Sequence, residues 1–115
     1  MISQVSRTNM RRLSRVTVFL CCSYIPFTAM SAISVERKAE LHNLLTQDCG
    51  SCHGMTLKGG LGPALTVEVI SNKPRELILE TVLNGRPGTP MPPWKNILSR
   101  EEIEWLVDML YKGVD

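Results

Sequence analysis

Aromatic residues are scarce in this chain. Its 115 residues include 2 Trp, 2 Tyr and 2 Phe, and three of these (Phe19, Tyr24 and Phe27) lie before residue 31. No stretch alternates apolar and polar residues as a half-buried strand does, and no repeat is visible. The length allows one small domain, and we expect it to be all-α. So few large apolar side chains make a marginal core, which indicates that a non-protein group fills part of the interior.

A strong excess of one charge sign is also missing. The chain has 13 Lys and Arg against 11 Asp and Glu, a net charge of +2. The four arginines among the first 31 residues precede an uncharged run at 16–35, and the residues after 31 carry 9 basic and 11 acidic side chains. A weakly acidic body of this kind excludes nucleic acid as a partner.

Residues 1–31 read as a secretory signal peptide. An arginine-rich start is followed by an apolar stretch, and the small residues Ala29 and Ser31 suit cleavage before Ala32. Residues 32–115 would then be the mature domain, exported to the periplasm. Arg11 and Arg12 also allow a twin-arginine signal.

An uncleaved membrane anchor is the alternative, because the uncharged run of 20 residues is long enough to span a bilayer. Pro26 and several interleaved hydroxyl side chains lower its hydrophobicity, which favours cleavage. The mature protein would then have no stable membrane insertion.

Cleavage removes Cys21 and Cys22 and leaves one pair, Cys49 and Cys52, followed directly by His53. This C-x-x-C-H spacing is typical of covalent c-type haem attachment, in which two thiols join the porphyrin and the histidine binds the iron. One helical turn presents both sulfurs to the same porphyrin edge.

Two other uses of a C-x-x-C pair fit less well. A zinc site needs two more ligands, and His42 is the one remaining candidate besides His53. A thioredoxin-like motif needs a strand and a βαβ context, which are absent from the pattern. One haem c with its iron, held by Cys49 and Cys52, is therefore the predicted cofactor.

Met91 is the predicted sixth ligand. It lies in a segment rich in proline and glycine, residues 88–94, that limits the movement of the thioether. Met55 is too close to His53 to reach the opposite face of the haem, and Met109 belongs to a patterned helix and is expected in the core. His42 remains a possible bis-histidine ligand, although its place in a helix favours a packing role.

Two segments, 48–65 and 85–94, resemble the class I cytochromes c, and more narrowly the small periplasmic cytochromes of the c-55X type, encoded beside the haem d1 nitrite reductase of denitrifying bacteria. The likeness covers nearly all of residues 36–112. It implies a class I cytochrome c fold and axial ligands at His53 and Met91. It also implies that the carbonyl of Pro63 accepts the imidazole N–H of the proximal histidine.

The same resemblance implies an electron-transfer protein and not an enzyme. It would carry single electrons to cytochrome cd1 nitrite reductase, or serve the enzymes that mature haem d1, through transient docking. We expect a monomer. Two other functions stay open: a ligand-binding haem sensor or enzyme in which Met91 dissociates, and a structural haem subunit of a membrane complex if the signal is not cleaved.

The helices follow from caps and periodicity. We expect helices at about 35–49 with Ser34 as the N-cap, in a short turn after Thr66, at 74–85 starting with Pro74, and after a capping box at 99–102. The predicted apolar faces are listed by helix: Val35, Ala39, Leu41, Leu44 and Leu45; Leu77, Ile78, Thr81 and Val82; Ile103, Leu106, Val107 and Leu110.

The remaining site residues are placed by chemistry. Trp94 is expected to pack near the haem or to donate its indole N–H to a propionate. Arg86 and Lys58 are candidate propionate partners, although a solvated role is the simpler one for each. The glycines at 59–62 would let the backbone approach the porphyrin.

The first prediction concerns processing and haem loading together. Protein purified from the periplasm should begin at Ala32 and have the mass of residues 32–115 plus one covalent haem, with one haem per chain by pyridine haemochrome assay. Intact mass spectrometry reads both events. A mass that retains residues 1–31 would favour the anchor, and a haem lost on acid extraction would contradict attachment through Cys49 and Cys52.

Overall fold

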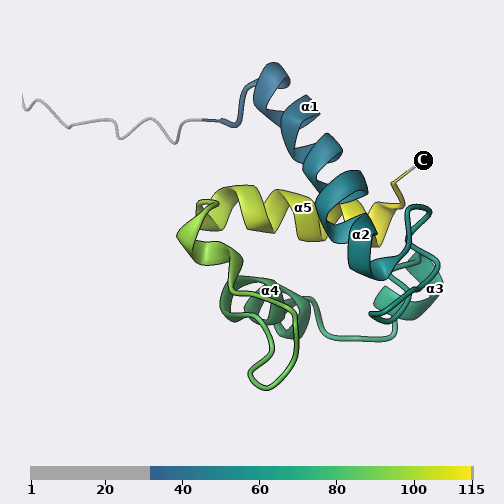
Figure 1. The fold of residues 1–115 in the computed structure, drawn as a ribbon. Coiled ribbons are helices and arrows are strands. Elements are labelled where there is room, and N and C mark those ends of the chain that lie inside the picture. The colour runs from purple at the N-terminus through teal and green to yellow at the C-terminus, as the bar shows by residue number, and fades with distance from the viewer. Residues whose placement is uncertain (1–31, 115) are drawn as a thin grey trace, which may run out of the picture. The chain divides into compact units, whose positions relative to one another are not determined.

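The computed structural model describes residues 32–114 (Figure 1). The predicted signal peptide and its cleavage site lie at or beyond the start of this range, so the structure does not bear on them. Within the described residues every regular element is a helix, and no strand occurs. The expected all-α fold is therefore confirmed.

The first helical run leads directly into the C-x-x-C-H motif. It consists of α1 (Val35–Leu44), a π-helical turn η1 (Leu45–Cys49) and α2 (Gly50–His53). The hydroxyl of Ser34 caps α1 by accepting the Arg37 N–H at 3.1 Å, as predicted. The run does not end near Cys49 as expected. It continues to His53 and stops at Gly54, whose φ of 88° suits glycine.

The middle of the chain holds short elements. Helix α3 (Val67–Ile70) forms the expected turn after Thr66, and α4 (Arg75–Asn84) runs up to Gly85. Pro74 is the N-cap of α4 and not its first helical residue, which is a shift of one position. The 3₁₀ turn η2 (Trp94–Asn96) was not predicted, because a single turn leaves no periodicity to detect.

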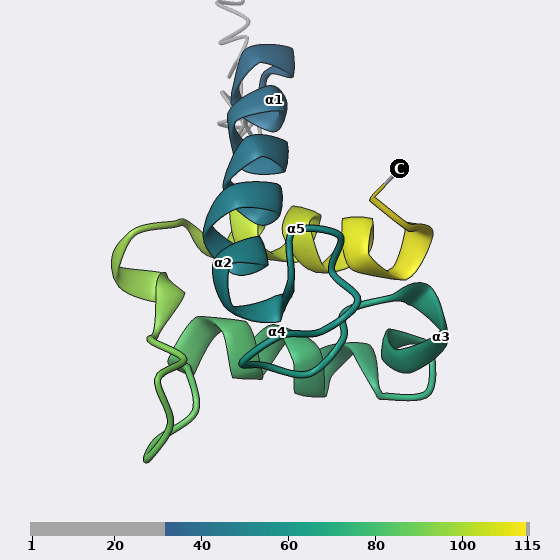
Figure 2. The same ribbon diagram turned by 45° about the vertical axis from the view of Figure 1, so that its right-hand side comes forward.

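Helix α5 (Arg100–Lys112) is the centre of the domain. Its predicted capping box is present: the Glu102 N–H donates to the Ser99 hydroxyl at 3.2 Å, and the Ser99 N–H donates to the Glu102 carboxylate at 2.8 Å. All four predicted core residues of this helix are buried. Helix α5 contacts α1, α3, α4 and η2, and Figures 1 and 2 show α1 crossing it while α4 lies along its other side.

The core is almost wholly aliphatic. Its buried members are Leu41, Leu45, Leu57, Ile70, Leu79, Leu83, Leu98, Ile103, Leu106, Val107 and Leu110. In α1 only part of the predicted face is buried, and Val35, in the first turn, is 78% exposed. In α4 the residues packed into the core are Leu79 and Leu83, which are not members of the predicted face.

Ion pairs connect the helices on the outside. Arg37 of α1 donates to Glu102 of α5 at 2.5 Å. Arg75 of α4 pairs with Asp108 of α5 at 2.7 Å. Arg100 lies within 3.5 Å of carboxylates on both α4 and α5. None of the helices formed by residues 32–114 has the length and apolar character needed to cross a membrane.

The second prediction concerns Glu102, which caps α5 and also accepts from Arg37. The hydrogen bond from Arg37 and the Ser99 N–H both lower the pKa of this carboxyl. Glu102→Ala should lower the free energy of unfolding by about 1–2 kcal/mol at pH 7, the sum of a cap and a partly exposed ion pair. A lowered folded pKa means that this contribution is present above the unfolded pKa of about 4.3 and fades as pH falls below it.

Denaturant unfolding of the haem-loaded protein between pH 3 and pH 7 measures both effects. Glu40→Ala is the matched control, because Glu40 contacts the same Arg37 but caps nothing and is exposed. Equal losses in the two variants would contradict the double role of Glu102.

Candidate haem-binding site

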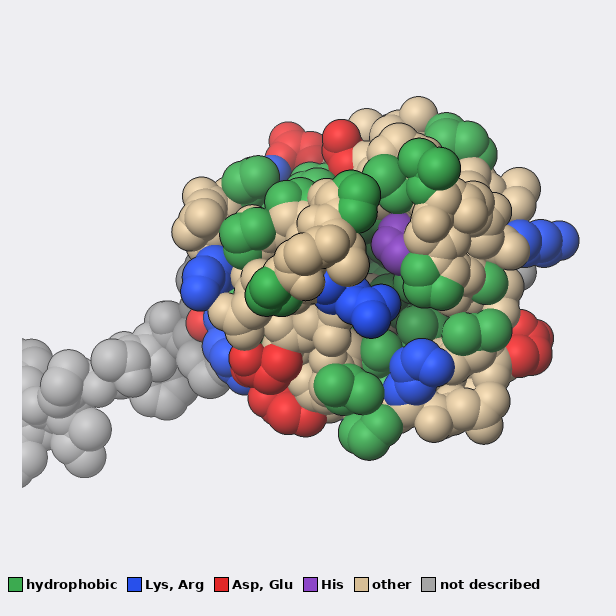
Figure 3. All heavy atoms as spheres, turned by 60° about the horizontal axis from the view of Figure 1, so that its bottom comes forward, with side chains coloured by type: hydrophobic (Ala, Val, Ile, Leu, Met, Phe, Trp, Pro, Cys, Tyr) green, Lys and Arg blue, Asp and Glu red, His purple; other side chains and the backbone are tan. Residues whose placement is uncertain are grey.

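A large cavity lies between the helices. It has a volume of about 690 Å³, which is in the range of cofactor pockets. Every helical element contributes to its wall, and most of the lining side chains are aliphatic. Figure 3 shows the hollow from its open side, with a histidine ring at its floor and hydrophobic and basic side chains around it. The predicted face of α4, namely Leu77, Ile78, Thr81 and Val82, lines this cavity, and Ile78 and Val82 also pack against the core.

The two motif cysteines lie at the wall of the cavity as free thiols. Cys49 is half-buried at the end of the π-helical turn, and Cys52 is exposed one turn later. Burial, followed by the charge of Asp48, raises the pKa of the Cys49 thiol to about 11, so it is protonated at neutral pH. A helical turn that offers both sulfurs to one space is the arrangement that double thioether attachment requires.

His53 is the last residue of α2, and its ring is oriented by the loop that follows. Nδ1 lies 2.7 Å from the carbonyl oxygen of Pro63. Because a carbonyl can only accept, Nδ1 must carry the proton, and Nε2 keeps a free lone pair, the form that binds a metal. A Cβ on Gly62 would stand 2.7 Å from the ring, so glycine is required there.

Backbone hydrogen bonds fix this loop to the end of α2. The Gly59 N–H donates to the His53 carbonyl and the Gly62 N–H to the Cys52 carbonyl, both at 2.8 Å. They satisfy carbonyls that the end of a helix leaves free. The close approach that the glycines permit is therefore to His53 and its neighbours within the chain.

Met91 is half-buried and lines the same cavity from the loop between α4 and η2. The two alternative ligands do not line it: His42 lies on α1, and Met109 packs against the core from α5. The cavity thus brings together His53 and Met91 from two separate segments of the chain.

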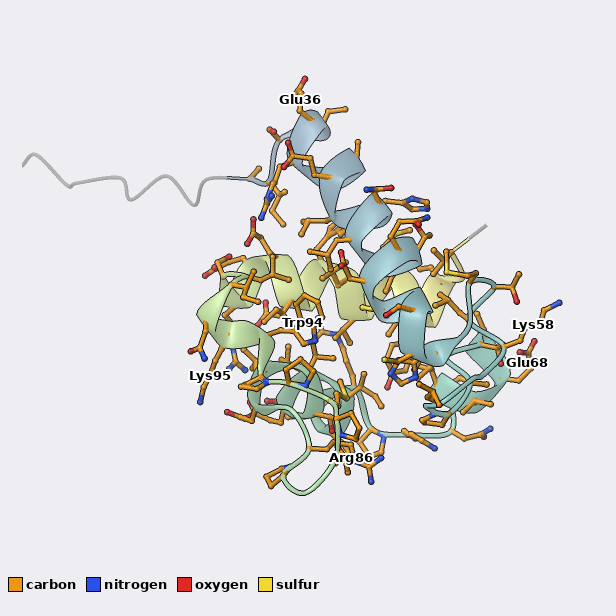
Figure 4. The ribbon with its side chains drawn as sticks, viewed as in Figure 1. Glu36, Lys58, Glu68, Arg86, Trp94 and Lys95 are labelled. Carbon is orange, nitrogen blue, oxygen red and sulfur yellow. The ribbon has the colours of Figure 1, made fainter. Side chains whose placement is uncertain are left out.

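The other candidate residues divide into two groups. Trp94 and Arg86 line the cavity, whereas Lys58 borders a second, shallower hollow on the side of α3. In Figure 4 Trp94 lies in the interior below α5, while Lys58 and Lys95 lie at the periphery. The structure records no hydrogen bond from the Trp94 indole within residues 32–114.

The residues at the cavity fit a c-type haem. Two thiols one turn apart, an imidazole with its outer nitrogen free, a thioether and apolar walls supply what covalent attachment and iron ligation need. A zinc site does not fit, because within residues 32–114 no three His, Cys, Asp or Glu side chains come together as ligands.

Comparison with known families agrees with this chemistry. Residues 36–110 match the family described as cytochrome C oxidase, cbb3-type, subunit III. Helices wrapped around a cavity with a C-x-x-C-H motif are the class I cytochrome c fold. The fold and the site define a c-type cytochrome, whose cofactor is haem c with its iron.

Individual relatives show to which family of c-type cytochromes the chain is similar. The chain is 55% identical over 89 residues to cytochrome c55X of Pseudomonas aeruginosa, covering 77% of this chain and 75% of the relative. It is 51% identical over 88 residues to cytochrome c55X of Stutzerimonas stutzeri, covering 76% and 78%. The solved structure of the c-type cytochrome NirC superposes with a TM-score of 0.68 at 59% identity, covering 70% of this chain and 94% of NirC. The chain belongs to the cytochrome c55X family.

A larger protein also contains a similar region. Dihydro-heme d1 dehydrogenase of Pseudomonas aeruginosa is 32% identical over 84 residues, which are 73% of this chain but 17% of the dehydrogenase. The solved structure named dihydro-heme d1 dehydrogenase NirN in complex with DHE aligns at 36% identity with a TM-score of 0.56. It covers 60% of this chain and 15% of the dehydrogenase.

Sequence reasoning missed several residues at the site. Lys73 and Leu61 line the cavity, and Leu61 is 94% exposed, so it stands at the opening. Gly62 was grouped with its neighbouring glycines, although it alone faces the His53 ring. Gly62 directly precedes Pro63, the expected partner of His53, and this position could have indicated that Gly62 lies beside the ring.

The third prediction concerns Met91. If its thioether binds the iron, the oxidised wild-type protein should show the near-infrared charge-transfer band of methionine ligation, and Met91→Ala should lose it. The reduction potential should fall in the same variant, because a thioether favours ferrous iron. Met109→Ala, which shortens a methionine outside the cavity, is the control and should keep the band. Survival of the band in Met91→Ala would disprove the assignment.

Proposed function

We propose that this protein is a periplasmic one-electron carrier with a single His/Met-ligated haem c. The observation that carries the proposal is that His53 and Met91 line the same cavity as the two attachment cysteines. When bound, the haem supplies the ferric and ferrous couple. The polypeptide supplies two permanent ligands, which keep the coordination sphere the same in both states and leave no site for a substrate.

Cytochrome cd1 nitrite reductase is the first candidate partner. The support is family membership, since the relatives are small cytochromes of the c55X type. A carrier for this reductase needs a haem edge near the surface and a small, transient interface. The open cavity, with the exposed Leu61 at its rim, supports the placement of such an edge at this opening.

A role in haem d1 maturation is the second candidate, and one specific observation favours it. A region of a dihydro-heme d1 dehydrogenase is similar to this chain, so a cytochrome of this type exists within a protein named for that oxidation. A dehydrogenation releases two electrons, which two molecules of a one-electron carrier can accept. The chain would then receive electrons instead of donating them to nitrite reduction.

Basic side chains outnumber acidic ones at the cavity, where Asp48 is the one acidic lining residue against Lys73 and Arg86. Lys73 and Arg86 line the cavity, and neither makes an ion pair with any residue from 32 to 114. The other three arginines of this range, Arg37, Arg75 and Arg100, form ion pairs with carboxylates on neighbouring helices. A partner with an acidic rim around its own redox centre would complement this face.

The fourth prediction tests direction and docking together. Reduced protein mixed with cytochrome cd1 nitrite reductase should be oxidised in a second-order reaction whose rate falls as ionic strength rises. Lys73→Glu should slow it several-fold at low salt, whereas Lys112→Glu, the same charge change away from the cavity, should not. Stopped-flow absorbance of the haem measures both.

An experiment that starts from the oxidised protein distinguishes the two roles. Oxidised protein mixed with dihydro-heme d1 dehydrogenase and its substrate should become reduced if the chain serves maturation, and a gene deletion should then leave the reductase without haem d1. Transfer to neither enzyme would refute both roles. Rapid carbon monoxide binding to the ferrous wild-type protein would instead favour a ligand sensor.

A further inference from the structure

We propose that residues 85–91 form a closed loop, which we call the methionine clasp, and that Gly85 and Thr89 are positioning residues that hold Met91 toward the iron. The inference rests on the proposed ligand role of Met91 and goes beyond it, because it assigns the hold on that ligand to two residues that do not touch the iron. Figure 4 shows the clasp as the loop that carries Arg86, below α4.

Gly85 is where the chain leaves α4 and meets the segment that follows Met91. It is buried, with φ at 66° and ψ at −167°. A Cβ there would stand 2.6 Å from the Met91 carbonyl oxygen and 2.7 Å from the Pro93 nitrogen. Both are backbone atoms in a proline-rich segment, so they cannot move aside as a flexible side chain would. Any side chain at 85 must push the backbone of Met91 outward.

Hydrogen bonds close the loop between these ends. The Arg86 N–H donates to the Met91 carbonyl at 3.1 Å. The Thr89 hydroxyl donates to the Arg86 carbonyl at 2.7 Å and accepts from the Met91 N–H at 3.4 Å. The Thr89 N–H donates to the same Arg86 carbonyl at 3.0 Å. Both backbone polar groups of Met91 are therefore held within its own loop.

The clasp is closed by contacts within the chain. Every bond in it joins atoms of residues 85–93, and four prolines in this stretch (Pro87, Pro90, Pro92 and Pro93) restrict the backbone further. A ligand held in place before binding loses little entropy when it binds and moves little when the iron changes oxidation state. The clasp therefore maintains methionine ligation in both redox states.

Gly85→Ala in the haem-loaded protein tests this, with Gly113→Ala as the matched control. Gly113 also has a positive φ, 95°, but an added Cβ there meets only the Val67 side chain, at 3.6 Å. Both variants should lose stability through backbone strain. Only Gly85→Ala should weaken the charge-transfer band of methionine ligation, lower the reduction potential and tighten imidazole binding to the ferric iron about tenfold or more.

A second pair of variants covers the case in which Gly85→Ala fails to load haem. Thr89 is exposed, so its replacement does not disturb the core. Thr89→Val keeps the shape but removes the hydroxyl bridge, and it should tighten imidazole binding several-fold. Thr89→Ser keeps the hydroxyl and should behave as the wild type does. The clasp is overturned if Gly85→Ala and Thr89→Val both keep the charge-transfer band and the imidazole affinity of the wild type. If Gly85→Ala carries no haem, an unchanged imidazole affinity in Thr89→Val is enough to overturn it.

If Met91 is not the iron ligand, the spectra will differ from those expected when only the clasp is wrong. If the wild-type protein lacks the band, or Met91→Ala retains it, then Met91 is not the ligand and the clasp has no ligand to hold. If Met91→Ala abolishes the band while the clasp variants keep it, the ligand role stands and the clasp is overturned. The same spectra therefore separate the two proposals.

Discussion

The cavity is the constraint on which the rest of this small domain depends. All seven helical elements contribute at least one side chain to its wall, so no part of the fold is independent of it. Side chains such as Leu44, Ile78 and Val82 are only half-buried by protein and face this space. With haem in place they become interior. Without it, apolar walls would be open to water, and their contribution to stability would be lost.

The two proposed iron ligands are held by different means. His53 ends a helix, and a loop returns to it: Pro63 accepts from the ring, Gly62 lies against it, and two N–H groups cover the last carbonyls of the helix. Met91 belongs to no helix and depends on bonds within its own loop. The histidine is thus fixed together with the attachment site, whereas the methionine is fixed separately, on the far end of α4. A change in either hold acts on one ligand alone.

The sequence predicted well those features that depend only on residues close together in the chain. The capping box at Ser99, the cap at Ser34 and the C-x-x-C-H motif each need only a few adjacent positions, and the structure shows both caps and a helical turn at the motif. The predicted face of α4 does line one space, the cavity, but the prediction missed the second apolar side of this helix, because periodicity reports which residues are apolar and not what they face. That second side packs into the core through Leu79 and Leu83. A cofactor gives a helix two apolar sides, and a search for one side finds only half of the pattern.

Backbone geometry in irregular loops, and contacts between distant segments, could not be read from the sequence. The φ of Gly85 and its approach to Met91 depend on how the loop after α4 turns back on itself, which no local pattern reports. The same holds for the charge at the cavity mouth. Three arginines are spent on ion pairs that join helices, and this leaves Lys73 and Arg86 at the opening as cations without such partners in residues 32–114. The chain after residue 31 has more acidic than basic side chains. Two cations nevertheless line the cavity beside the single acidic residue Asp48, because long-range pairing between helices, and not composition, determines which charges stay without an ion-pair partner within residues 32–114.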